Sequence, residues 1–224
     1  MVKASIIITA FNSASFIERS VLSALSQDFP RESFEVIVVD DGSTDNTLQV
    51  LEAVGDDIRI INNPHGGFVA AVNRGFLEAR GEYVTKLDSD DVFHENLLKE
   101  EVSILDGQQN VDFVYADYFE KTGEKVEYIS TEDIFASVAI GTMYRREKLA
   151  AEGFWREGLG FPEYDLLLRV WDSWHGYRIA KPLFTYIRRT ESVSKTSGWQ
   201  EAALQKLKEL HPEHVAEIAR IRKY

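Results

Sequence analysis

The first half of this sequence alternates short apolar runs, rich in Val and Ile, with longer segments whose apolar residues recur at helical spacing. Four of the runs predict buried strands, at residues 5–9, 34–39, 58–61 and 83–87. The first segment between them predicts a helix that Asn12 or Ser13 can cap, with an apolar stripe of Phe16, Ile17, Val21, Leu22 and Leu25. Alternating strands and helices form βαβ units. We therefore expect an α/β fold with a Rossmann-like, mostly parallel central sheet flanked by helices.

The second half has a less regular pattern. Its apolar runs predict short strands, at residues 111–115, 138–144, 177–179 and 183–187. A turn at residues 121–124 predicts a hairpin, and the apolar spacing of residues 163–172 predicts a helix. The polar tail from Gln200 is expected to be helical with an interruption at Pro212.

Length and composition exclude several classes of protein. The chain has 224 residues without a repeat or linker, which suits a single domain. It has no cysteine, so disulfides and thiolate sites are excluded, and its net charge of −12 argues against a nucleic-acid partner. No membrane span or signal peptide is apparent, so we expect a cytoplasmic protein. Basic residues in the tail could give weak peripheral membrane contact, but interspersed Glu residues favour a packed helix.

Two acidic turns follow predicted strands. Asp88-Ser89-Asp90-Asp91 comes after the fourth strand, and Asp40-Asp41-Gly42-Ser43 comes after the second. Residues two apart in an extended segment project to the same side, so Asp88 and Asp90 can share one ligand. Their carboxylates suit Mg²⁺ or Mn²⁺, and a diphosphate would complete such a site. Either turn alone is more often solvated, but both lie at carboxyl ends of parallel strands, so together they favour a metal and nucleotide site.

These turns belong to a longer series of motifs. In chain order the series is Ser5-Ile6-Ile7-Ile8-Thr9-Ala10-Phe11-Asn12, Val38-Val39-Asp40-Asp41-Gly42-Ser43, Asn73-Arg74-Gly75, Ala79-Arg80-Gly81-Glu82-Tyr83 and Leu87-Asp88-Ser89-Asp90-Asp91. In order and spacing the series resembles the glycosyltransferases of family 2. The resemblance implies one GT-A domain over residues 1–224. Its parts would be a nucleotide-sugar-binding half (1–110), an acceptor-side half (111–199) and a C-terminal helical tail (200–224).

The resemblance also implies roles for individual residues of the first half. The pocket for the nucleobase and ribose would be lined by Thr9, Phe11 and Asp40. Asp88 would meet the ribose, and Asp90 would bind the metal, Mn²⁺ or Mg²⁺. Asn73 matches a family position near the donor, although an Asn that satisfies loop backbone is an equal alternative.

In the second half the sequence departs from the family pattern at two positions. Pro162-Glu163 stands where the family usually has Glu-Asp, so Glu163 matches the catalytic Asp and would be the general base. The alternative is a carboxylate that only stabilises a helix N-terminus. Arg189, within residues 186–194, lies where many relatives have a His that faces the donor phosphate or metal. Its guanidinium could neutralise a leaving diphosphate, or it could be a surface Arg.

Several aromatic and His residues are harder to assign. Five aromatic residues fall near the expected acceptor side: Trp155, Phe161, Tyr164, Trp171 and Trp174. Such rings can pack on sugar faces, but we expect most of them in the core. The residues His65, His94 and His175 lack metal-ligand spacing, and we assign them no role.

The function that the resemblance implies is inverting transfer of a sugar from a nucleotide-diphosphate donor to an acceptor hydroxyl. We expect a UDP-sugar as donor, a glycan or glycolipid as acceptor, and a role in glycan or polysaccharide synthesis. One alternative is a catalytically degenerate protein of this fold that only binds sugar nucleotide or glycan. A nucleotidyltransferase would need a Gly-rich basic phosphate loop, which Ala10-Phe11-Asn12-Ser13 is not. A phosphoacceptor signalling module is complete in roughly half this length.

Overall fold

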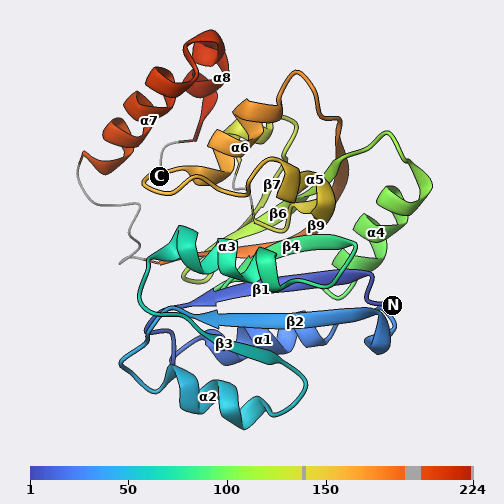
Figure 1. Cartoon of the computed structure of the whole chain (residues 1–224). Helices are drawn as coiled ribbons and strands as arrows, with labels where there is room; N and C mark the ends of the chain where they lie inside the picture. The colour runs from blue at the N-terminus through green and yellow to red at the C-terminus, as the bar shows by residue number, and fades with distance from the viewer. Residues whose placement is uncertain (138–139, 190–197, 223–224) are drawn as a thin grey trace.

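The structure is a computed structural model that describes residues 1–137, 140–189 and 198–222. Within these ranges nine strands form one sheet in the order β3-β2-β1-β4-β8-β6-β9-β5, and β7 pairs with β6 (Figure 1). The sheet therefore runs through both the regular first half of the sequence and the less regular second half.

The first half of the sheet is parallel, as the alternation predicted. Its strands are β1 (Ala4–Ala10), β2 (Phe34–Asp40), β3 (Arg59–Asn62) and β4 (Tyr83–Asp88). β1 lies at the centre and pairs in parallel with both β2 and β4. The connections contain α1 (Ile17–Leu25), α2 (Thr47–Val54) and α3 (Phe68–Glu78). All four strands end at the same edge of the sheet, the left edge in Figure 1, where the two acidic turns begin.

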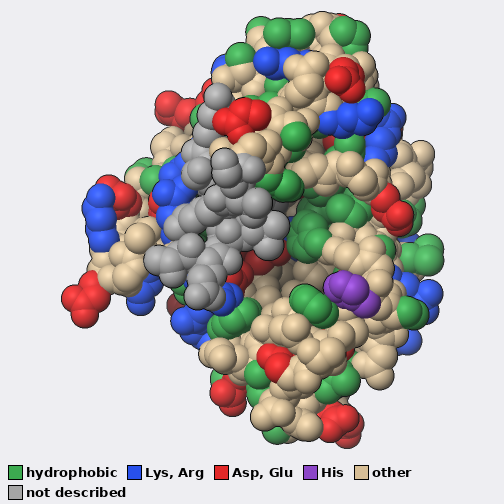
Figure 2. Space-filling model, turned by 90° about the vertical axis from the view of Figure 1, so that its left-hand side faces the viewer, with side chains coloured by type: hydrophobic (Ala, Val, Ile, Leu, Met, Phe, Trp, Pro, Cys, Tyr) green, Lys and Arg blue, Asp and Glu red, His purple; other side chains and the backbone are tan. Residues whose placement is uncertain are grey.

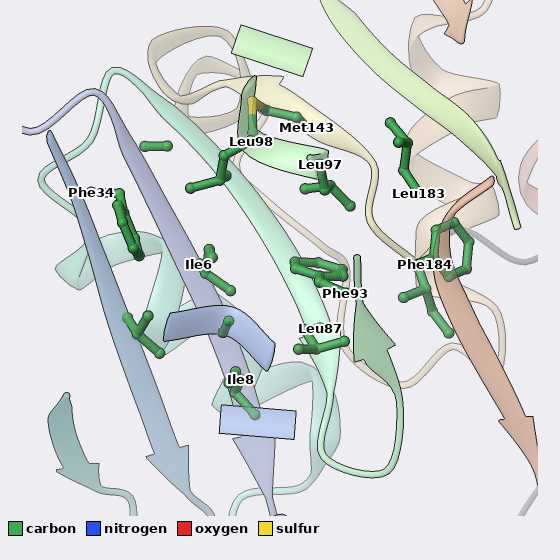
Figure 3. Packing of buried hydrophobic residues seen from close by; sticks show 14 of the residues in the cluster. Ile6, Ile8, Phe34, Leu87, Phe93, Leu97, Leu98, Met143, Leu183 and Phe184 are labelled. Atoms are coloured by element: carbon green, nitrogen blue, oxygen red, sulfur yellow. The ribbon is translucent and has the colours of Figure 1, made fainter. Parts of the chain in front are cut away.

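Helices cover both faces of this sheet because successive strand residues point to opposite sides. Ile6 and Ile8 of β1 are fully buried in a cluster that includes residues of α1 and of α4 (Leu97–Gly107). Figure 3 shows these side chains with Leu97 and Leu98. Ile7, between them, is buried in a second cluster with residues of α3 and of α6 (Pro162–Val170). The sheet is therefore the middle layer of three.

The close fit of α3 on β1 depends on a glycine in the Asn73-Arg74-Gly75 motif. A Cβ atom at Gly75 would lie 2.2 Å from Cγ2 of Ile7. Any side chain at this position would therefore push α3 away from the strand. The position of α3 matters because its first residue, Phe68, lies on the wall of the site described below.

The second half adds antiparallel and parallel strands to the same sheet. Its elements are β5 (Val92–Phe93), β6 (Phe113–Thr122), β7 (Lys125–Ile129), β8 (Met143–Arg145), α5 (Arg146–Ala151) and β9 (Gly176–Arg188). The hairpin predicted at residues 121–124 joins β6 and β7. The strand predicted at 138–144 is confirmed only from Met143, and residues 138–139 lie outside the described residues.

Two expectations for local structure were wrong. The runs at residues 177–179 and 183–187 form one strand, β9, because β6 pairs with both parts and a register shift absorbs the residues between them. Neither Asn12 nor Ser13 caps α1 by its side chain; the N-cap is Phe16. The Asn12 side chain instead accepts from the backbone N–H of Thr44, at 2.8 Å, and links the loop after β1 to the turn after β2.

The tail is helical and interrupted at Pro212, as predicted. It contains α7 (Trp199–Leu210), a 3-10 turn at Pro212–His214 and α8 (Val215–Arg220). Buried residues such as Leu207 and Ile218 pack these helices on the cluster that contains α6. None of the helices in the described ranges has both the length and the apolar character that crossing a membrane requires.

Candidate active site

Two adjoining cavities open where the parallel strands end. The larger has a volume of about 660 Å³ and the smaller about 380 Å³. They share a wall formed by Gly67, Phe68, Asp88 and Asp90. Figure 2 shows that this face of the molecule is hollowed, with acidic side chains visible inside the hollow. The acidic turn after β4 therefore lies between two spaces of ligand size.

Each carboxylate of that turn has a different environment. Asp88 accepts from Nζ of Lys86 at 2.5 Å, and a carboxylate oxygen of Asp90 lies 3.4 Å from Nη1 of Arg189. Asp91 is fully buried, and its Oδ1 accepts from the backbone N–H of Ile187 at 2.7 Å. Asp91 thus ties the turn to the end of β9, whereas Asp88 and Asp90 line both cavities.

The electrostatics of Asp90 suit a divalent cation. Burial raises the pKa of Asp90 above its ordinary value, the nearby Asp88 raises it further, and Arg189 partly offsets both effects. A cation near the two carboxylates would relieve this destabilisation. Within the described ranges, no three His, Asp or Glu side chains gather as a ready cation site. A pair of carboxylates is enough for Mg²⁺ or Mn²⁺, because waters and substrate phosphates usually supply the other ligands of these cations.

The smaller cavity contains Thr9, Phe11 and Arg189 from the predicted donor site. The ring of Phe11, which is 47% exposed, stacks on His65 with centroids 4.5 Å apart. The guanidinium carbon of Arg189 lies 4.1 Å from the centroid of the Phe16 ring. Arg189 therefore lies on the wall of the smaller cavity, with 40% of its side chain exposed, and its role toward a donor stays a prediction. Residues 190–194 of its motif lie outside the described residues.

The adjacent residues Asp40 and Asp41 have different environments. Asp40 is buried behind the cavity wall and accepts from the backbone N–H of Ser43 at 3.1 Å. Asp41 lines the smaller cavity, and its carboxylate accepts from the backbone N–H groups of Gly66 and Gly67, both at 2.9 Å. The contact between Asp40 and a nucleobase stays a prediction, and Asp41 is the acidic residue of this turn that reaches the cavity.

The Asn73 side chain binds loop backbone. Its Nδ2 donates to the carbonyl of Trp155 at 2.8 Å, and its Oδ1 accepts from the N–H of Trp155 at 3.1 Å. Asn73 is absent from the described walls of both cavities. This geometry corresponds to the alternative of an Asn that hydrogen-bonds to loop backbone. Asn73 thereby fixes the position of Trp155, which does line the larger cavity.

Glu163 lies on the wall of the larger cavity, near the start of α6. Burial raises its pKa from 4.5 to about 7; Lys86 opposes this increase and Asp88 adds to it. A carboxylate with a pKa close to neutral is well suited to accept a proton. Lys86 itself is buried, and its Nζ lies 4.9 Å from the centroid of the Phe68 ring.

The neighbouring carboxylate, Asp165, has a structural role. It is fully buried and is held by three cationic or titratable side chains: Nε of Arg169 at 3.1 Å, Nη1 of Arg156 at 3.2 Å and Nε2 of His211 at 2.8 Å. Asp165 is absent from the described cavity walls. Of the two carboxylates, Glu163 is therefore the one that a substrate can reach.

A family model for glycosyl transferase family 2 matches residues 5–172. The chain belongs to this family. The match includes both acidic turns and Glu163, so it extends well past the first hundred residues on which the sequence resemblance rested. Relatives that are named as glycosyltransferases also match part of this chain.

Two named relatives each match part of this chain. A poly(ribitol-phosphate) β-N-acetylglucosaminyltransferase, TarS, of Staphylococcus aureus is 36% identical over 110 residues, 47% of this chain and 19% of the relative. An uncharacterized glycosyltransferase of Rickettsia felis is 35% identical over 135 residues, 58% of this chain and 22% of the relative. This chain therefore spans about a fifth of the length of these relatives.

Solved structures confirm the GT-A type of fold. Residues 1–349 of TarS in complex with UDP-GlcNAc superpose with a TM-score of 0.79 at 21% identity, covering 97% of this chain and 72% of that one. A mannosyltransferase of Pyrobaculum calidifontis in complex with GDP-Man and Mn²⁺ gives a TM-score of 0.69 at 18% identity, covering 97% and 68%. At sequence identities this low, the structural similarity establishes the fold alone.

Sequence reasoning gave no site role to several residues of the cavity walls, among them Asp41, His65, Lys86 and Trp199. Lys86 has a signal in hindsight, because a Lys two residues before Asp88 on a strand projects to the same side. His65 and Trp199 have none, because each reaches the site from a segment that only tertiary packing places there.

Proposed function

We propose that this glycosyltransferase transfers a sugar from a UDP-sugar to an acceptor hydroxyl with inversion at the anomeric carbon. The observation that supports this most is the pair of adjoining cavities with Asp88 and Asp90 between them and Glu163 in the larger one. Two spaces separated by an acidic wall suit a donor whose nucleotide and sugar lie on either side of a diphosphate.

The smaller cavity would hold the nucleoside. The exposed ring of Phe11 offers a stacking surface for a nucleobase, and Thr9 on the same wall can bond a base or ribose. Asp88 would accept from the ribose. UDP is the favoured nucleotide because a neighbour of the same fold was crystallised with UDP-GlcNAc.

The diphosphate would lie near Asp90 and Arg189. We assign Asp90 as a ligand of Mn²⁺ or Mg²⁺, and the neighbour with GDP-Man and Mn²⁺ supports a divalent cation in this fold. A bound cation would supply charge stabilisation for the departing diphosphate. Arg189, 3.4 Å from Asp90, can move its planar donors onto phosphate oxygens and oppose the same negative charge.

Glu163 would act as the general base. Its carboxylate accepts the proton of the acceptor hydroxyl while the acceptor oxygen bonds to the anomeric carbon. The bond between that carbon and the diphosphate oxygen breaks, and its electron pair leaves with UDP. Attack from the side opposite the diphosphate inverts the anomeric configuration. The place of Glu163 on the wall of the larger cavity, together with its raised pKa, supports the active enzyme rather than a binding-only protein of the same fold.

Donor binding and turnover give separate tests. Calorimetry should show that UDP binds with Mn²⁺ or Mg²⁺ and that chelator weakens this binding. Release of UDP from UDP-GlcNAc and related UDP-sugars, with and without acceptor, measures turnover. UDP binding without any turnover across the donors and acceptors tested would favour the degenerate alternative, and absence of UDP binding would contradict the proposed donor.

A further inference from the structure

One part of the wall of the larger cavity is not shared with the smaller cavity, which is the one proposed to hold the nucleoside. This part includes residues of the loop at 155–161, Glu163 and Trp199 of α7. Trp155 and Phe161 are almost fully buried, whereas Trp199 is partly exposed. Trp199 therefore offers a flat apolar surface to a ligand in this part of the cavity, close to the residue proposed as base.

Trp199 is held firmly relative to that loop. Its ring meets the ring of Phe161 edge to face, with centroids 5.0 Å apart. A Cβ atom at Gly160 would lie 2.6 Å from Cβ of Ala203, one turn along α7. The backbone of the loop thus packs directly on the helix that carries Trp199.

The tail is also tied to the helix that carries Glu163. His211 follows α7 and lies 2.8 Å from the buried carboxylate of Asp165, two residues after Glu163 in α6. Both ends of α7 are therefore fixed to elements of the cavity wall. The helix that carries Trp199 is thus held against both the loop and α6, and a binding surface requires such a rigid support.

The charge of the larger cavity restricts its ligands. Among its described lining residues, four are acidic and one, Lys86, is basic. An anionic group near Glu163 would meet Glu163 and Glu157, and the Nζ of Lys86, the one basic side chain among the described lining residues, is already paired with Asp88 at 2.5 Å. Sugar hydroxyls, in contrast, can donate hydrogen bonds to carboxylates.

We propose that this part of the cavity binds an uncharged pyranose of the acceptor, with the apolar face of the sugar ring on Trp199 and its reacting hydroxyl toward Glu163. The inference rests on the proposed function and goes beyond it, because it names the acceptor class and the residue that holds it. Flat aromatic surfaces combined with a few polar groups are the usual composition of sites for such ligands.

The test measures acceptor and nucleotide binding separately on the full chain. Saturation-transfer NMR, in the presence of UDP and Mn²⁺, compares neutral disaccharides ending in glucose, galactose, mannose or N-acetylglucosamine with counterparts that carry a uronate or a phosphate. Trp199→Leu keeps apolar packing on Phe161 but removes the flat ring, and Trp199→Phe restores a ring. Trp171→Ala is the matched control, because Trp171 is 37% exposed and absent from the described cavity walls.

We expect a neutral disaccharide to bind at least tenfold more tightly than its anionic counterparts. Trp199→Leu should weaken that binding about tenfold, Trp199→Phe should recover most of it, and neither variant nor Trp171→Ala should change the affinity for UDP. Preference for anionic disaccharides, no response from any neutral one, or equal binding by Trp199→Leu and wild type would overturn the inference while UDP binding stays normal. Loss of UDP binding by the wild type would instead contradict the proposed function.

Discussion

Replacing Glu163 with Gln should slow the enzyme and stabilise the fold at the same time. Burial holds the pKa of Glu163 at about 7, where an ordinary Glu has 4.5. The folded protein therefore carries a charged group at pH 8 in a place that disfavours the charge. The interval between the two values corresponds to about 3 kcal/mol of unfolding free energy. Gln has a similar shape and no charge, so the variant avoids this cost.

The pH dependence gives the sign of the effect. Below about pH 4.5 Glu163 is protonated in both the folded and unfolded chain, and its ionisation costs no stability. As the pH rises toward 7, the unfolded chain releases this proton while the folded chain still holds it, and above pH 7 the folded chain must release it too. The stability that the wild type has at low pH is lost over this range. The unfolding free energy of Glu163→Gln should therefore exceed that of the wild type by up to about 3 kcal/mol at pH 8, with the gap closing toward pH 5.

Catalysis should change in the opposite direction. Gln cannot accept a proton, so turnover should fall about 10²- to 10⁴-fold, while the affinity for UDP stays nearly constant. Wild-type turnover should rise with pH through about 7, as Glu163 loses its proton. Urea unfolding at pH 5 and pH 8 measures stability, and UDP release measures turnover. Glu157→Gln, an exposed position on the same wall, is the control for stability.

Two results would refute the reasoning. If Glu163→Gln and the wild type have the same unfolding free energy at both pH values, burial does not raise the pKa of Glu163. If the variant retains wild-type turnover, another group accepts the proton, and the match between Glu163 and the family's catalytic Asp is shifted.

Variants at three other positions test separate parts of the structure. Asp90→Asn keeps the shape of the turn but removes charge, so calorimetry should show at least a tenfold loss of Mn²⁺-dependent UDP affinity; unchanged affinity would exclude Asp90 as the ligand. Arg189→Ala should weaken UDP binding or turnover, and Arg189→Lys should recover only part of the loss because a point charge cannot form paired hydrogen bonds; equal kinetics for Ala and wild type would assign Arg189 to structure alone. Glu101 is fully buried, burial raises its pKa well above the ordinary value, and its carboxylate oxygens have no hydrogen-bond partner among the described residues. Glu101→Met should raise the unfolding free energy by about 1–3 kcal/mol at pH 8 and by less at pH 5. The melting temperature should rise accordingly, and a lower melting temperature at both pH values would show that the carboxylate has a stabilising partner.

Local sequence patterns predicted the elements of the first half because its strands are buried on both faces and its helices have one buried side. The second half was harder to read. β9 contains an irregularity opposite Asp117, and the polar residues within it interrupt the apolar run that would mark one strand. The cap of α1 failed for a different reason: the Asn12 side chain bonds to the turn at Thr44, a partner far away in the sequence.

The sequence predicted that Asp88 and Asp90 lie together, and both line the same two cavities. The extended backbone assumed for the pair is not present, because β4 ends at Asp88 and Asp90 lies in the turn after it. The distinction between Asp40 and Asp41 was not predictable, since it depends on the backbone N–H groups of Gly66 and Gly67. Trp199 could not have been found either, because α7 reaches the cavity only through its packing on the loop at Gly160.

The paired hydrogen bonds of Asn73 have a consequence for how this enzyme can diverge. Both of these hydrogen bonds go to the backbone of residue 155, so they do not depend on which side chain stands there. The indole of Trp155 itself is almost fully buried and packs on Phe68 and Phe76. Exchanging it for a smaller side chain would therefore keep the anchor of the loop on α3, but it would leave a cavity that costs about 3–5 kcal/mol of unfolding free energy.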